Sequence, residues 1–127
     1  MNGLHLIADL HDCACAPERL LDAPGLEAEC VAACAEHGLT VVGRFFHQFR
    51  NADGQAAGVT GTVVLAESHL AIHTWPEISG VTLDVYVCNF SADNSAAARA
   101  VFHAMTASFS PGRIESREVA RGSLLRA

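Results

Sequence analysis

The sequence lacks long apolar runs and has few basic residues. No window reaches the roughly 18 uninterrupted apolar residues of a membrane-spanning helix, and residues 1–10 lack the basic start and cleavage site of a signal peptide. Eight Lys and Arg against fourteen Asp and Glu give a net charge of −6, which argues against binding a nucleic-acid backbone. We therefore expect a cytoplasmic protein with no membrane and no nucleic-acid partner.

The sequence also lacks a recognisable cysteine framework. Its five cysteines are odd in number, and none form a Cys-x-x-Cys pair. Cys13 and Cys15 could supply thiolates to a metal, but the signature spacing is missing, so we expect no metal. Cys30 and Cys34 lie four residues apart in a helical pattern, which is typical of a core face.

Half of the 127 residues are apolar, which is enough for the core of one domain over residues 1–127. Residues 3–10 alternate between apolar and polar side chains, as a half-buried strand does. Similar patterns predict strands at 39–49, 59–68, 69–76, 80–88 and 113–120, and helices at 26–37 and 91–109.

This order predicts an α+β fold: a two-layer sandwich with an antiparallel sheet and both helices packed on one face. The other face of the sheet must then be solvated or covered by a partner.

The run from Leu65 to Glu77 holds many reactive side chains, and three interpretations compete. His69 and His73 have the four-residue spacing of metal ligands on a helix, but Pro76 and the strand pattern argue against a helix there. Ser68 could be a nucleophile, yet the Gly-x-Ser-x-Gly motif of hydrolases is absent. The histidines could also be ordinary hydrogen-bonded residues of a sheet, with Trp75 in the core.

The block Glu67–Glu77, ESHLAIHTWPE, closely resembles the processing region of the prokaryotic S-adenosylmethionine decarboxylases. These are small, self-processing, pyruvoyl-dependent enzymes. The segments HLIADLHDC, FFHQF, LDVYVC and VARGS also resemble the family, so the likeness covers nearly the whole chain.

The resemblance implies that the chain makes its own cofactor, because no side chain offers the carbonyl electron sink that this decarboxylation needs. The Ser68 hydroxyl attacks the Glu67 carbonyl, and elimination cuts the chain into a β chain, 1–67, and an α chain, 68–127. Elimination leaves residue 68 as dehydroalanine, and hydrolysis of this residue with loss of ammonia gives a pyruvoyl group that forms a Schiff base with the substrate amine.

The resemblance also implies the roles of neighbouring residues. His73 is the processing histidine, and the Thr60 hydroxyl takes the place of a family serine in hydrogen bonding to the developing oxyanion. Cys88 returns a proton to the substrate carbon. Glu77, Phe49 and Trp75 correspond to substrate-binding positions, with Glu77 accepting hydrogen bonds from the ribose hydroxyls.

The implied reaction is decarboxylation of S-adenosylmethionine to the aminopropyl donor of spermidine synthesis. The implied assembly is a homodimer of αβ units with active sites at the interface.

Some segments depart from the family pattern. The loop at 50–58 is longer, and Val87 and Asn89 flank Cys88 where the family has Thr and Gly. Alternatives therefore stay open: a related pyruvoyl-dependent decarboxylase of arginine or ornithine, an unprocessed non-catalytic partner subunit, or a metal-binding module. Glu77 and Phe49 favour the nucleoside substrate, since a free amino acid has no ribose or adenine.

Overall fold

The computed structural model describes residues 2–122 and 124. Two α-helices and two short 3-10 helices (η) accompany six strands. The elements are β1 (Gly3–His11), η1 (Pro17–Leu20), α1 (Ala23–Glu36), β2 (Val41–Arg50), β3 (Ala56–Leu65), β4 (Ser68–Trp75), η2 (Pro76–Ile78), β5 (Gly80–Cys88), α2 (Ser95–Ser108) and β6 (Arg113–Arg121).

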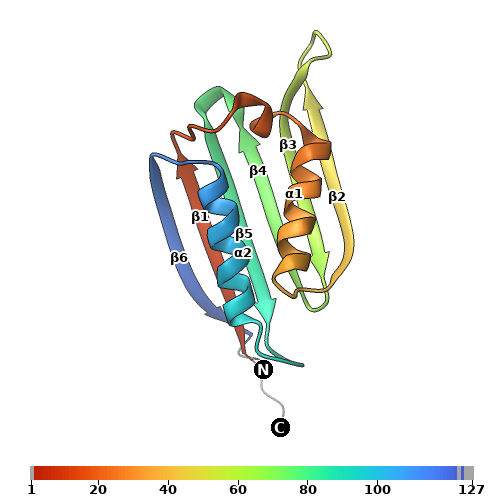
Figure 1. Ribbon diagram of the computed structural model, residues 1–127, viewed down its shortest axis with the longest axis vertical. Coiled ribbons are helices and arrows are strands. Elements are labelled where there is room, and N and C mark those ends of the chain that lie inside the picture. Colours follow the sequence, from red (N-terminus) through yellow and green to blue (C-terminus); the bar gives the residue numbers. More distant parts are fainter. Residues whose placement is uncertain (1, 123, 125–127) are drawn as a thin grey trace.

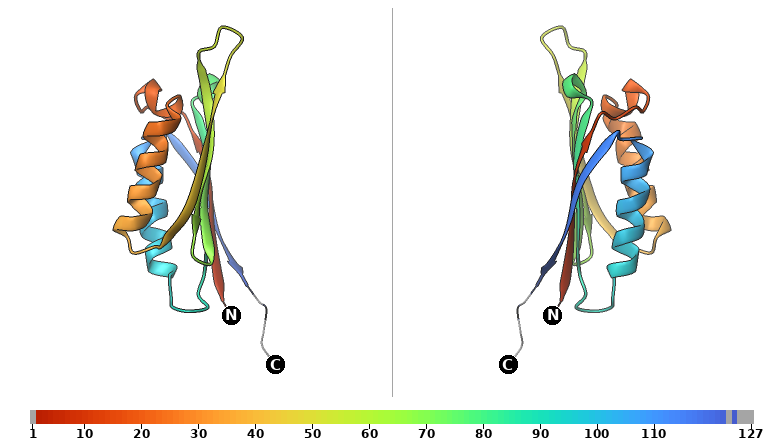
Figure 2. Two further views of the ribbon diagram at one scale, coloured as in Figure 1. Left: turned by 90° about the vertical axis from the view of Figure 1, so that its right-hand side faces the viewer. Right: turned by 90° about the vertical axis from the view of Figure 1, so that its left-hand side faces the viewer.

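The six strands form one sheet in the order β2-β3-β4-β5-β1-β6, and every neighbouring pair is antiparallel (Figure 1). Both α-helices lie on the same side of this sheet, as the side views in Figure 2 show. The predicted two-layer α+β sandwich is therefore confirmed.

The core lies between the sheet and the two helices. Alternate residues of the central strands point into it, among them Leu6, Leu70, Ile72 and Val85, which are at most 1% exposed. The helices pack against them with a buried stripe of side chains: Leu26, Cys30, Ala33, Cys34, Ala98, Val101, Phe102 and Met105. Burying each large side chain contributes about 1.5–3 kcal/mol, so this interface fixes which sheet face is covered.

The opposite sheet face, here called the open face, carries the other set of alternating side chains. It combines histidines and polar residues with aromatic side chains. Phe45 is 71% exposed, Phe49 48% and Trp75 45%. The half-buried residues of β4 on this face are His69, Ala71 and His73.

Several boundaries differ from the sequence-based prediction. α1 begins at Ala23, three residues early, with a proline in its first turn. α2 begins at Ser95 rather than Ser91, because Asn89 and Asp93 side chains accept backbone hydrogen bonds from Asn94 and Ser95 and hold a turn there. β4 begins at Ser68, which the sequence pattern had placed at the end of the preceding strand. Across the described ranges, neither α-helix is long and apolar enough to cross a membrane.

Candidate active site

The turn between β3 and β4 consists of Ala66 and Glu67, and Ser68 is already the first residue of β4. Glu67 has φ of 69°, a left-handed conformation that is strained for a residue with a side chain. Its carboxylate accepts a hydrogen bond from the Ser91 hydroxyl at 2.7 Å. The peptide bond predicted to be cut thus joins a strained residue to a strand.

Ser68 lies against the end of β5. The Cys88 backbone N–H donates to Ser68 Oγ at 3.2 Å, and Cys88 is only 5% exposed. The structure therefore brings together the predicted pyruvoyl precursor and the predicted proton donor. Cys88 ends β5 as the sequence pattern indicated.

A second group of predicted residues lies at the other end of β3 and β4. Thr60 and His73 are direct cross-strand partners, and Thr60 Oγ1 is hydrogen-bonded to His73 Nδ1 at 2.9 Å. They line a cavity of about 230 Å³ that all three predicted substrate-binding residues also line: Phe49, Trp75 and Glu77.

Two residues that the sequence analysis missed hold this cavity in shape. The Thr74 hydroxyl, 6% exposed, accepts from Val59 N–H at 2.9 Å and donates to Leu20 O at 2.7 Å. Gln48 donates to Gly58 O and accepts from Ala23 N–H, both at 2.9 Å. The alternation of β4 signals that Thr74 faces the core, where a hydroxyl needs partners. No sequence signal identifies Gln48.

The two groups are far apart within one chain. Ser68 pairs with Leu65 at one end of the hairpin, whereas His73 pairs with Thr60 five residues further along the strand. At about 3.3 Å per residue, the separation is about 16 Å. A single chain thus does not place His73 beside the Glu67–Ser68 bond.

His69 and His73 do not act as a pair, although both lie on the open face. His69 Nε2 lies 3.1 Å from Asp84 Oδ2, and the same oxygen lies 2.8 Å from His5 Nε2. His5 and Asp84 were not among the predicted site residues. Their alternation in β1 and β5 places them on the same face as His69, but only the order of the strands brings the three together.

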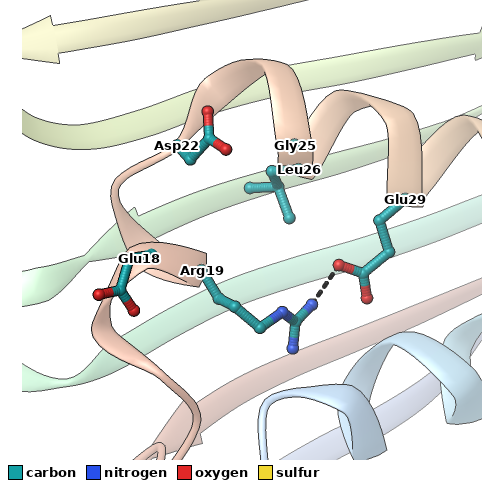
Figure 3. Close-up of a pocket in the computed structure, with 6 residues that line it drawn as sticks. All are labelled: Glu18, Arg19, Asp22, Gly25, Leu26 and Glu29. Atoms are coloured by element: carbon teal, nitrogen blue, oxygen red, sulfur yellow. Dashed lines mark hydrogen bonds and ion pairs between the residues drawn. The ribbon is translucent and has the colours of Figure 1, made fainter.

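A separate cavity of about 180 Å³ lies between η1 and α1 on the helix side (Figure 3). Arg19 forms an ion pair there with Glu29, donates to Ser108 O and stacks at 4.4 Å over the Phe109 ring. These contacts join η1 to both α-helices. None of the predicted site residues lines this cavity, so its arginine is a structural residue.

The comparisons with known proteins agree with this geometry. The family model described as S-adenosylmethionine decarboxylase matches residues 4–122. A Thermoplasma volcanium protein named S-adenosylmethionine decarboxylase proenzyme is 32% identical over 126 residues, which covers 97% of this chain and 86% of the relative. A Syntrophomonas wolfei protein of the same name is 37% identical over 120 residues, covering 94% of this chain and 86% of the relative.

A solved structure supports the same assignment. The crystal structure of the adenosylmethionine decarboxylase from Aquifex aeolicus superposes with a TM-score of 0.81 at 28% sequence identity, covering 98% of this chain and 94% of that chain. Family model, relatives and solved structure each extend over nearly the full length of the sequence, and the chain belongs to the S-adenosylmethionine decarboxylase family.

Proposed function

We propose that this protein decarboxylates S-adenosylmethionine with a pyruvoyl group that it makes from Ser68, after cutting its own chain between Glu67 and Ser68. The observation that carries the proposal is the turn itself. It places Ser68 directly after a residue in a strained left-handed conformation, and the backbone N–H of the predicted proton donor, Cys88, donates a hydrogen bond to the Ser68 hydroxyl.

The residues around Ser68 fit a pyruvoyl group. When formed, this group supplies a carbonyl that accepts the electrons left by the departing carboxylate. Cys88 ends its strand beside residue 68 and is almost buried, so its thiol can deliver a proton where water has little access.

The cavity at the other end of the sheet suits the nucleoside part of the substrate. Phe49 and Trp75 supply aromatic surface for a flat base or a sulfonium cation. Glu77 supplies a carboxylate that can accept hydrogen bonds from two ribose hydroxyls. A free amino acid has no ribose or adenine for these contacts, which is why we favour S-adenosylmethionine over arginine or ornithine.

We assign the two ends of the sheet to one composite site in a homodimer. In this dimer, the two copies pack their open faces together around a two-fold axis that runs across the strands. Each strand then lies antiparallel to its counterpart in the other copy. The Ser68–Cys88 end of one chain then meets the Thr60–His73 end of the other. This arrangement also covers the exposed aromatic side chains of the open face.

Intact mass analysis of the purified protein tests the processing step. We expect two chains, residues 1–67 and 68–127, with the second carrying a pyruvoyl group at its start. Ser68→Ala should remain a single chain, while Ser91→Ala, which removes only the hydrogen bond to Glu67, should still be cut. A wild-type protein that stays whole would overturn the enzyme assignment.

Carbon dioxide release then identifies the substrate. The cut protein should release labelled CO2 from carboxyl-labelled S-adenosylmethionine and not from labelled arginine or ornithine. Release from either amino acid alone would leave the pyruvoyl chemistry standing and reject the nucleoside substrate.

A further inference from the structure

Three side chains on the open face converge where three adjacent strands meet. His5 comes from β1, His69 from β4 and Asp84 from β5, and these strands are neighbours at the centre of the sheet (Figure 1). Their imidazole and carboxylate ligand atoms all lie within 4.8 Å of one another. Two imidazoles and one carboxylate make a donor set that suits zinc and similar divalent transition metals.

The distances match the size of a metal-centred site. Asp84 Oδ2 lies 2.8 Å from His5 Nε2 and 3.1 Å from His69 Nε2. Ligands at about 2.0–2.1 Å from a tetrahedral zinc ion lie about 3.3 Å from one another. A small outward movement of the two rings is therefore enough to admit an ion.

Within one chain, the site is half-buried. The exposed fractions of the His5, Asp84 and His69 side chains are 19%, 27% and 37%. The strands fix the three Cα positions, because His5 and His69 both pair with Tyr86 of β5. Binding an ion therefore costs little conformational entropy of the backbone. Three ligands leave a fourth position open.

One neighbouring charge opposes a cation at this place. Arg121 Nη1 lies 3.2 Å from His5 Nδ1, and its guanidinium stacks at 4.3 Å over the Tyr86 ring. Arginine only donates, so this contact puts the His5 proton on Nε2, where it points at Asp84. Metal binding through Nε2 requires that proton to move to Nδ1, and the Arg121 contact must then break.

We infer that His5, His69 and Asp84 form a binding site for a divalent transition metal, with zinc as the expected class of ion, and that Arg121 restrains its occupation. All three ligands come from one chain, and in the proposed packing of the open faces the site lies at the dimer interface.

Calorimetric titration of zinc into untagged, chelator-treated wild-type protein tests the inference. We expect one ion per chain. Magnesium at millimolar concentration should not compete, because it prefers an all-oxygen octahedral shell. His5→Ala and Asp84→Ala should each weaken zinc binding by about tenfold or more, while His47→Ala, which removes a histidine of the same face on β2, should leave it unchanged.

Arg121→Gln leaves all three ligands in place and should change the affinity for zinc in the opposite direction. It should strengthen zinc binding several-fold, and Arg117→Gln on the same strand should not. The inference is overturned if wild-type protein binds no zinc, if His5→Ala binds as tightly as wild type at an unchanged Tm, or if magnesium displaces zinc. Weaker binding in Arg121→Gln would reject the restraining role.

Discussion

Thr60 Oγ1 and His73 Nδ1 are 2.9 Å apart on directly paired residues of β3 and β4. The hydroxyl therefore fixes how the imidazole presents its other nitrogen, Nε2. Thr60→Val keeps the shape of the side chain and removes the hydrogen bond, so self-cleavage should slow by about tenfold or more. Thr60→Ser should be cut at nearly the wild-type rate.

The cleavage rate of each variant is followed by mass spectrometry after synthesis. Thr62→Val, two residues along β3 and opposite Ala71, is the matched control and should be cut normally. Equal rates for Thr60→Val and wild type would show that the hydroxyl takes no part in processing.

The composite site predicts complementation between two inactive variants. Ser68→Ala and His73→Ala should each remain uncut when produced alone. Produced together, they form mixed dimers in which the chain with the Ser68→Ala substitution supplies its His73 to the intact Ser68 of the other chain. Random pairing gives about a quarter of the wild-type sites.

Mass spectrometry makes this result unambiguous. The 68–127 fragment that appears should carry the His73→Ala substitution, because only the chain with that substitution still has a serine to cut at. If the mixture stays as uncut as the separate variants, the site lies within one chain and the proposed packing of the open faces is wrong.

Glu77→Gln tests the assignment of the cavity beside η2. A neutral amide makes weaker hydrogen bonds to the ribose hydroxyls than a carboxylate does, at a cost of about 1.5–3 kcal/mol. We expect KM for S-adenosylmethionine to rise by about 10- to 100-fold, with complete self-cleavage. Glu36→Gln, at the exposed end of α1, is the control for loss of charge. An unchanged KM would remove Glu77 from the substrate site.

The positive φ of Glu67 predicts strain at the scissile junction. In the uncut Ser68→Ala background, the free energy of unfolding should be about 1 kcal/mol higher for Glu67→Gly than for Glu67→Ala, since only glycine adopts this conformation freely. Both variants lose the carboxylate that accepts from Ser91, so the loss of this hydrogen bond does not contribute to the difference between them. Urea denaturation measures the difference, and a more stable alanine variant would contradict the strain.

The two cysteines of α1 should be unreactive in the folded protein. Burial raises the pKa of Cys34 to about 11 and raises that of Cys30 further. Unfolding restores an ordinary thiol pKa of about 8.5. Below that pH the thiols are neutral in both states, so they leave the free energy of unfolding at its full value. As the pH rises toward 11 only the unfolded thiols ionise, and the free energy of unfolding falls. Iodoacetamide mapping at pH 8 should modify both only in denaturant.

The sequence predicts the strands and helices well where a local pattern determines them. The β5 segment alternates cleanly between core and open face, and its observed bounds, Gly80–Cys88, are the predicted ones. The start of α2 was missed because side chains of Asn89 and Asp93 form a turn that competes with the helix. Propensity alone does not reveal that competition.

The site was predictable as a set of residues and not as an arrangement. The motif gives Ser68 and His73 five positions apart, and the predicted strand already separated them, but the sequence did not show that both belong to one strand, β4, near its opposite ends. The partners of His69 were hidden for a related reason. His5 and Asp84 are distant in sequence, and the strand order places β1 beside β5 rather than beside β2.

The order of the strands has a further consequence once the chain is cut at residue 67. Read across the sheet, β2 and β3 come from the first fragment, β4 and β5 from the second, β1 from the first and β6 from the second. Neither fragment holds a contiguous sheet, so neither has a core of its own. Folding is a one-chain process before the cut and a two-chain process afterwards. Mature protein that is unfolded and diluted should therefore recover at a rate that depends on its concentration, whereas the uncut Ser68→Ala chain should regain its protomer fold at a rate that does not.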